Sequence, residues 1–130
     1  MYTEYPLIHL EKVEPGPGEK STRFRVRIDC QFEHLGRIYT IPAGFKTDFS
    51  SVPRPVWPLI PPHGLATVPS IKHDFLYDYQ IGEKEIGRKR ARWEVDQAFL
   101  RDLLAEGMKP FQARLMYGMV RLFGRPYWIN

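Results

Sequence analysis

Cysteine is almost missing from this sequence. Cys30 is the only one among 130 residues, so no disulfide can form within the chain. Stability must therefore come from packing, and a reducing compartment is the expected site of synthesis.

Long hydrophobic runs are also missing. No stretch approaches the roughly 18 apolar residues that a membrane span needs, and the opening residues MYTEYPLIHLEK lack the basic-then-apolar pattern of a secretion signal. We therefore expect no integral membrane span. The net charge of +4 mildly favours anionic partners, but it is too small to predict a nucleic-acid partner. No internal repeat is present, and the length predicts a single domain over residues 1–130.

The first third of the chain has the pattern of a small antiparallel sheet. Residues 23–32 alternate strictly between polar and apolar, which predicts a strand with one wet face. Its apolar face would carry Phe24, Val26, Ile28, Cys30 and Phe32. Residues 5–13 and 37–41 read as further strands, with turns at Pro15–Gly18 and Gly36.

Proline is plentiful in the next segment, and helical patterns follow it. Seven of the 12 prolines lie between Pro42 and Pro69, a density that excludes a long helix or an inner strand there. Ile71, Phe75 and Tyr79 then recur at helical spacing as far as about Gly82. Two more helices are predicted at about 88–106, capped by a left-handed Gly107, and at about 110–123. The fold class is therefore α+β, with three helices that pack as antiparallel neighbours.

One carboxylate lies on a largely apolar helical face. Asp96 is followed by Phe99, Leu100 and Leu103 at helical spacing, so it needs a polar partner. His73 on the preceding helix is the nearest candidate, with Tyr77 one turn later on the same face. A carboxylate-oriented histidine has the geometry of a general base, whereas a His-Asp-Tyr network can equally serve only to hold two helices together. Both interpretations stay open.

A second set of oxygen donors suggests a hard cation. Asp74 follows His73 and is directed toward the preceding loop, residues 44–53, which offers Asp48, hydroxyl groups and backbone carbonyls such as that of Phe49. Carboxylate and carbonyl oxygens are the ligands that calcium prefers. The alternative is that Asp48 and Ser50 only organise turns in a proline-rich loop. Zinc is a weaker hypothesis, because one histidine without a usable thiolate is a poor zinc set.

Four basic residues begin the second predicted helix. Arg88, Lys89, Arg90 and Arg92 lie where the helix dipole already favours anions, so something acidic should compensate them. Glu83 and Glu85 are internal candidates, and the phosphates of lipid or nucleic acid are external ones.

The runs TDFSSVP, HDFLY and VDQAFLRDLL resemble the core of the prokaryotic secreted phospholipase A₂ group over about half of the chain. The resemblance implies that His73 activates water, that Asp96 orients it and that Tyr77 supports it by hydrogen bonding. It also implies calcium ligation by Asp48, Phe49 and Asp74, and hydrolysis of a phospholipid ester.

Over its whole length the sequence is more similar to the phage and prophage domain-of-unknown-function family 1353, on the residues IPAGFKTDFSSVPR, HDFLY and the later Asp96. This resemblance implies synthesis in the cytoplasm of a bacterial host and an association with the virion. Two functional hypotheses follow: a calcium-assisted hydrolase acting on a phospholipid surface, and a non-catalytic tail, baseplate or assembly protein. The second would associate with other phage proteins or with copies of itself.

Overall fold

The computed structural model describes residues 10–13, 23–47 and 67–128. The chain forms two compact units, Met1–Asp48 and Phe49–Asn130. The first contains the described strands and the second the described helices, so the predicted α+β class is confirmed. The single-domain prediction stays a prediction. Within the described residues, no helix is both long and apolar enough to cross a membrane.

The described residues of the strand unit form two antiparallel sheets. One has the order β1-β2-β5, from Leu10–Val13, Arg23–Val26 and Lys46–Thr47. The other is a hairpin of β3, Cys30–His34, and β4, Arg37–Ile41, in which Phe32 is paired with Tyr39. Its two turn residues, Leu35 and Gly36, have φ values of 52° and 75°, the left-handed conformation that matches the twist of a tight hairpin.

The prediction of one continuous strand over residues 23–32 is wrong. The chain breaks between Val26 and Cys30, where Asp29 Oδ1 accepts the Ala43 N–H at 2.6 Å and Val26 bonds to Gly44 and Phe45. These contacts turn the chain from one sheet into the other. Val26, Cys30 and Phe32 are buried as expected. Ile28 lies in the break and is 57% exposed, so its predicted place on the buried face is also wrong.

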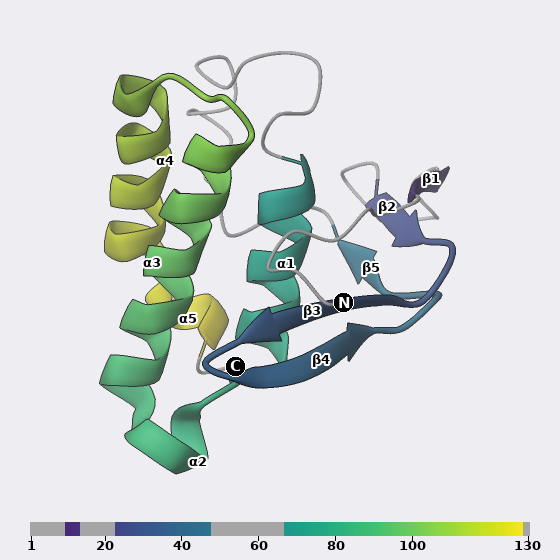
Figure 1. Cartoon of the computed structure of the whole chain (residues 1–130), viewed down its shortest axis with the longest axis horizontal. Helices are drawn as coiled ribbons and strands as arrows, with labels where there is room; N and C mark the ends of the chain where they lie inside the picture. The colour runs from purple at the N-terminus through teal and green to yellow at the C-terminus, as the bar shows by residue number, and fades with distance from the viewer. Residues whose placement is uncertain (1–9, 14–22, 48–66, 129–130) are drawn as a thin grey trace. The chain divides into compact units, whose positions relative to one another are not determined.

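Within residues 67–128, the helical unit has three long helices: α1, Thr67–Asp78; α3, Arg88–Ala105; and α4, Pro110–Phe123. Successive long helices run in opposite directions (Figure 1). Gly107 has a φ of 94° and ends α3 as predicted, because this left-handed conformation suits glycine. The Pro15–Gly18 turn and residues 48–66 lie outside the described residues.

Two short helices were not predicted: α2, Glu83–Ile86, and α5, Arg125–Trp128. The first helix ends at Asp78, before Tyr79, which is 58% exposed rather than part of the buried face. In α5, Trp128 is fully buried, and its indole N–H donates to Glu83 Oε1 at 2.8 Å. This hydrogen bond therefore joins the two short helices to each other.

One apolar core cluster of this unit lies between α3 and α4. Its buried side chains are Phe99, Leu103, Met108, Ala113, Met116 and Val120. The helices meet here because each places apolar residues at three- and four-residue intervals along one face. At one end of this core the buried side chains become polar, and those polar groups form the candidate site.

Candidate functional site

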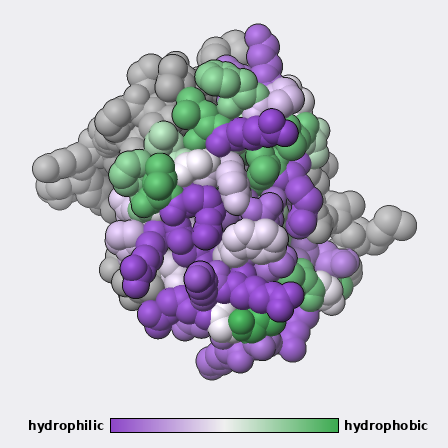
Figure 2. All heavy atoms as spheres, turned by 90° about the vertical axis from the view of Figure 1, so that its left-hand side faces the viewer, coloured by the Kyte–Doolittle hydropathy of each residue, from purple (hydrophilic) through white to green (hydrophobic). Residues whose placement is uncertain are grey.

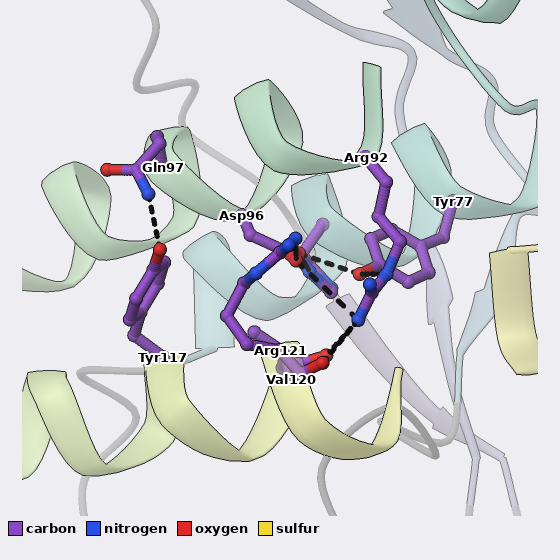
Figure 3. Close-up of polar contacts among 8 residues, drawn as sticks. Tyr77, Arg92, Asp96, Gln97, Tyr117, Val120 and Arg121 are labelled. Carbon is purple, nitrogen blue, oxygen red and sulfur yellow. Dashed lines mark hydrogen bonds and ion pairs between the residues drawn. The ribbon is translucent and has the colours of Figure 1, made fainter. Parts of the chain in front are cut away.

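Asp96 is the centre of a buried polar cluster within the helical unit. Its Oδ1 lies 2.7 Å from His73 Nε2 and accepts a 2.7 Å hydrogen bond from the Tyr77 hydroxyl. Its Oδ2 accepts a 2.8 Å hydrogen bond from Arg121 Nη1. Figure 3 shows the side chains of Tyr77, from α1, and Arg121, from α4, directed toward the carboxylate of Asp96 on α3. The structure therefore brings together His73, Tyr77 and Asp96.

Helix α1 presents its two polar rings side by side. His73 and Tyr77 are four residues apart, so they project from the same face toward α3. Their ring centroids are 4.2 Å apart, and the ring of Phe99 lies 4.7 Å from that of His73. His73 is only 1% exposed and Asp96 is not exposed at all. This tight packing fixes the orientation of the imidazole.

Arg92 connects the cluster to the end of α4. It donates through Nη2 to the carbonyl oxygens of Val120 and Arg121, at 2.7 and 2.8 Å, and through Nε to the Tyr77 hydroxyl at 3.0 Å. The Val120 carbonyl also accepts the Gly124 N–H, whereas the Arg121 carbonyl lies in the last turn, where carbonyl groups lack partners within the helix. A cation there also suits the helix dipole. Arg92 thus acts as a side-chain cap for α4.

Gly124 allows α4 to approach this close to α1. A Cβ atom at this position would lie 2.4 Å from the Val120 carbonyl oxygen and 2.9 Å from the Tyr77 hydroxyl. Glycine is needed here for space, since its φ of −78° suits any residue. The position of Tyr77 in the cluster therefore depends on a small residue beyond the end of α4.

Burial and hydrogen bonding act in opposite directions on Asp96. Burial raises the pKa of its carboxyl group, but the hydrogen bond and charge of His73, with the hydrogen bonds from Tyr77 and Arg121, outweigh it and leave the pKa below the usual value. Burial, followed by the neighbouring Asp96 charge, raises the pKa of the Tyr77 hydroxyl far above its usual value. Asp96 is therefore an ionised acceptor and Tyr77 a neutral donor.

These shifts predict losses of stability at both ends of the pH range. The lowered pKa of Asp96 gives stability that is complete above about pH 4, the unfolded value, and is lost as the pH falls through the folded value. The raised pKa of Tyr77 gives stability that is lost above about pH 10. Chemical denaturation across pH should show both losses. Tyr77→Phe should remove part of the alkaline loss, and an unchanged alkaline profile would contradict this assignment.

The predicted cation ligands are only partly described. Asp74 lies on α1 beside His73 and is 9% exposed, whereas Asp48 and Phe49 lie outside the described residues. Within residues 10–13, 23–47 and 67–128, no three His, Cys, Asp or Glu side chains are grouped so that they could hold a metal ion. The convergence of Asp48 with Asp74 stays a prediction.

Sequence reasoning did not identify the basic partners of the buried acids. No sequence pattern indicated that Arg121 would contact Asp96, because this contact depends on where the end of α4 meets α3. A second buried ion pair joins α1 to α3, with Lys72 Nζ 3.1 Å from Asp102 Oδ2. Lys72 is 1% exposed and Asp102 3%. The four- and three-residue spacing of Asp102 from the apolar residues Ala98 and Phe99 was the one available hint of its burial.

Comparisons with known proteins identify the family and no activity. The family model described as "Protein of unknown function (DUF1353)" matches residues 24–120, which is most of the chain. The chain therefore belongs to this family. No curated protein and no solved structure matches it.

Proposed function

We propose that this protein is a calcium-assisted, phospholipase A₂-like ester hydrolase in which His73 activates water. The observation that supports this most directly is the pair of 2.7 Å contacts that His73 Nε2 and the Tyr77 hydroxyl make with one oxygen of Asp96. The sequence resemblance implies the same three residues in these roles. In the phage or prophage setting that it also implies, the substrate would be phospholipid of the host envelope.

His73, Asp96 and Tyr77 each have a separate role in this mechanism. With Asp96 ionised, His73 Nε2 carries the hydrogen and donates it, so the lone pair of Nδ1 accepts the proton from the attacking water. The carboxylate holds this tautomer and stabilises the imidazolium that forms. Tyr77 and Arg121 position the carboxylate and do not exchange protons with the substrate.

Calcium would be held by oxygen atoms beside this pair. Asp74 supplies a mostly buried carboxylate next to His73, and the proposed set adds the carboxylate of Asp48 and the carbonyl of Phe49. A carboxylate and carbonyl set of this kind suits a hard cation. When bound, calcium would polarise the ester carbonyl and stabilise the developing negative charge.

Fatty-acid release from mixed phospholipid vesicles tests the proposal. The wild-type protein should release fatty acid with calcium and stop when a chelator is added. His73→Gln should reduce the rate by about 10²- to 10⁴-fold, since it removes the general base. Asp74→Asn should raise the calcium concentration required. Arg114→Ala, an exposed change on α4, is the matched control and should leave the rate unchanged. Wild-type protein that is folded and supplied with calcium, yet releases no fatty acid, would overturn the proposal.

Burial favours a second candidate function. His73 and Asp96 are almost completely enclosed, and Arg92 and Arg121 tie their cluster to α4. Under this proposal the cluster only fixes the helices of a non-catalytic tail, baseplate or assembly protein. Such a protein would be made in the host cytoplasm and join the virion through other phage proteins or copies of itself. Variants of His73 would then change stability or assembly, and no variant would change a hydrolysis rate.

A further inference from the structure

Basic side chains surround two adjoining hollows at the start of α3. One has a volume of about 410 Å³ and is lined by Arg88, Lys89, Arg92, Arg121, Arg125 and Trp128. The other, of about 510 Å³, shares three of these residues and adds Arg90. Figure 2 shows hydrophilic side chains gathered over the lower part of this face, at the height where α2 and the start of α3 lie in Figure 1. We call the smaller cavity the basic hollow.

Acidic groups neutralise only part of this charge. Glu83 accepts a hydrogen bond from Arg88 at 3.0 Å, and Asp96 accepts one from Arg121 at 2.8 Å. Lys89 and Arg125 are exposed and make no ion pair in the described part of the chain. The five cations of the basic hollow therefore meet two carboxylates, one of which is shared with the imidazole of His73.

The backbone adds to the positive potential of the hollow. Helix α3 has no acidic residue in its first turn, and Gly87 at its N-cap offers no side-chain acceptor. The N–H groups of this turn carry the positive end of the helix dipole. Asp96, further along α3, lies 3.9 Å from Arg92, but the first turn of the helix offers no acid to Lys89. The positive potential at the start of α3 would therefore favour a bound anion.

Phosphate fits this arrangement better than a carboxylate does. The cations come from α3, α4 and α5, so their donors approach one volume from several directions, as the tetrahedral oxygens of phosphate require. A phosphate monoester also carries up to two negative charges, which would neutralise part of the excess positive charge of these side chains. We propose that the basic hollow binds a phosphate group, carried by a soluble phosphomonoester or by a lipid headgroup. This does not depend on hydrolysis at His73.

Calorimetric titration of the full chain with inorganic phosphate, at constant ionic strength, tests the proposal. The wild-type protein should show saturable binding that weakens as salt is raised. Lys89→Ala combined with Arg125→Ala should weaken it roughly tenfold or more, since two charge-assisted contacts are lost. Both residues are exposed and lie outside the Asp96 cluster, so the variant should keep its thermal melting curve. Arg114→Ala is the control for loss of one surface charge.

Vesicles distinguish the two sources of phosphate. Phosphatidylcholine vesicles with added phosphatidic acid present a phosphomonoester headgroup, and phosphatidylcholine alone is the blank. Tighter binding to these vesicles than to inorganic phosphate, lost in the double variant, would assign a lipid headgroup. Binding of free phosphate with no gain on vesicles would assign a soluble ligand. Absence of saturable binding in both assays, or equal binding by the wild type and a folded double variant, would overturn the proposal.

Discussion

Replacement of Asp96 by alanine should lower the free energy of unfolding by about 3–5 kcal/mol, as expected when one partner of a buried charge network is removed. The alanine leaves His73 Nε2, the Tyr77 hydroxyl and Arg121 Nη1 without the acceptor that they share. Desolvated donors that lack an acceptor are costly. Urea denaturation followed by circular dichroism measures the loss.

Two further substitutions on α3 separate the charge of Asp96 from its position. Asp96→Asn keeps an acceptor of the same shape without the negative charge, so its loss of stability should be intermediate. Glu94→Ala removes an acid that lies on the same helix outside the cluster, and it should change stability by no more than about 0.5 kcal/mol. If Asp96→Ala proved as stable as Glu94→Ala, Asp96 would not hold this cluster together.

The second large effect is expected at the buried pair between α1 and α3. Asp102→Leu should cost about 3–5 kcal/mol, because it leaves the ammonium group of Lys72 buried without the carboxylate 3.1 Å away. Lys72→Met should cost a similar amount, because it removes from the buried carboxylate of Asp102 the cation 3.1 Å away. Both side chains are enclosed, so water cannot replace the lost partner.

The double variant tests whether the two charges act as a pair. Lys72→Met with Asp102→Leu replaces both ions with apolar side chains, so it should be more stable than either single variant. A complete double-mutant cycle measured by denaturation gives the coupling energy. Additive losses would show that each ion is stabilised by its other neighbours and that their mutual contact contributes little.

The helices follow from local signals in the sequence. The third predicted helix, 110–123, has the bounds of α4, because Pro110 suits a first turn and apolar residues recur along one face. The bounds of α3 agree with prediction because Gly107 supplies the left-handed residue after its last turn. The sequence did not predict α2 and α5, because a helix of four residues is too short to show a repeating apolar pattern.

The strands show the limit of such patterns. Alternation over residues 23–32 predicted one ladder, but pairing partners decide where a strand ends. Residues 23–26 pair with β1 and β5, whereas residues 30–34 pair with β4. The exposed Ile28 lies between these two sets of hydrogen bonds. The side-chain pattern indicates which face of a strand is apolar, but it does not indicate which other strand will pair with it.

The sequence by itself determined the three long helices, apart from the end of α1, and it placed His73, Tyr77 and Asp96 within reach of one another. Helical spacing and short connections leave few other arrangements. Only the tertiary structure decided that Arg92 and Arg121 complete the cluster and that Lys72 pairs with Asp102. Long basic side chains can reach many acids. Which acid they contact depends on which helix faces meet and exclude water, since only there does an ion pair become hard to replace.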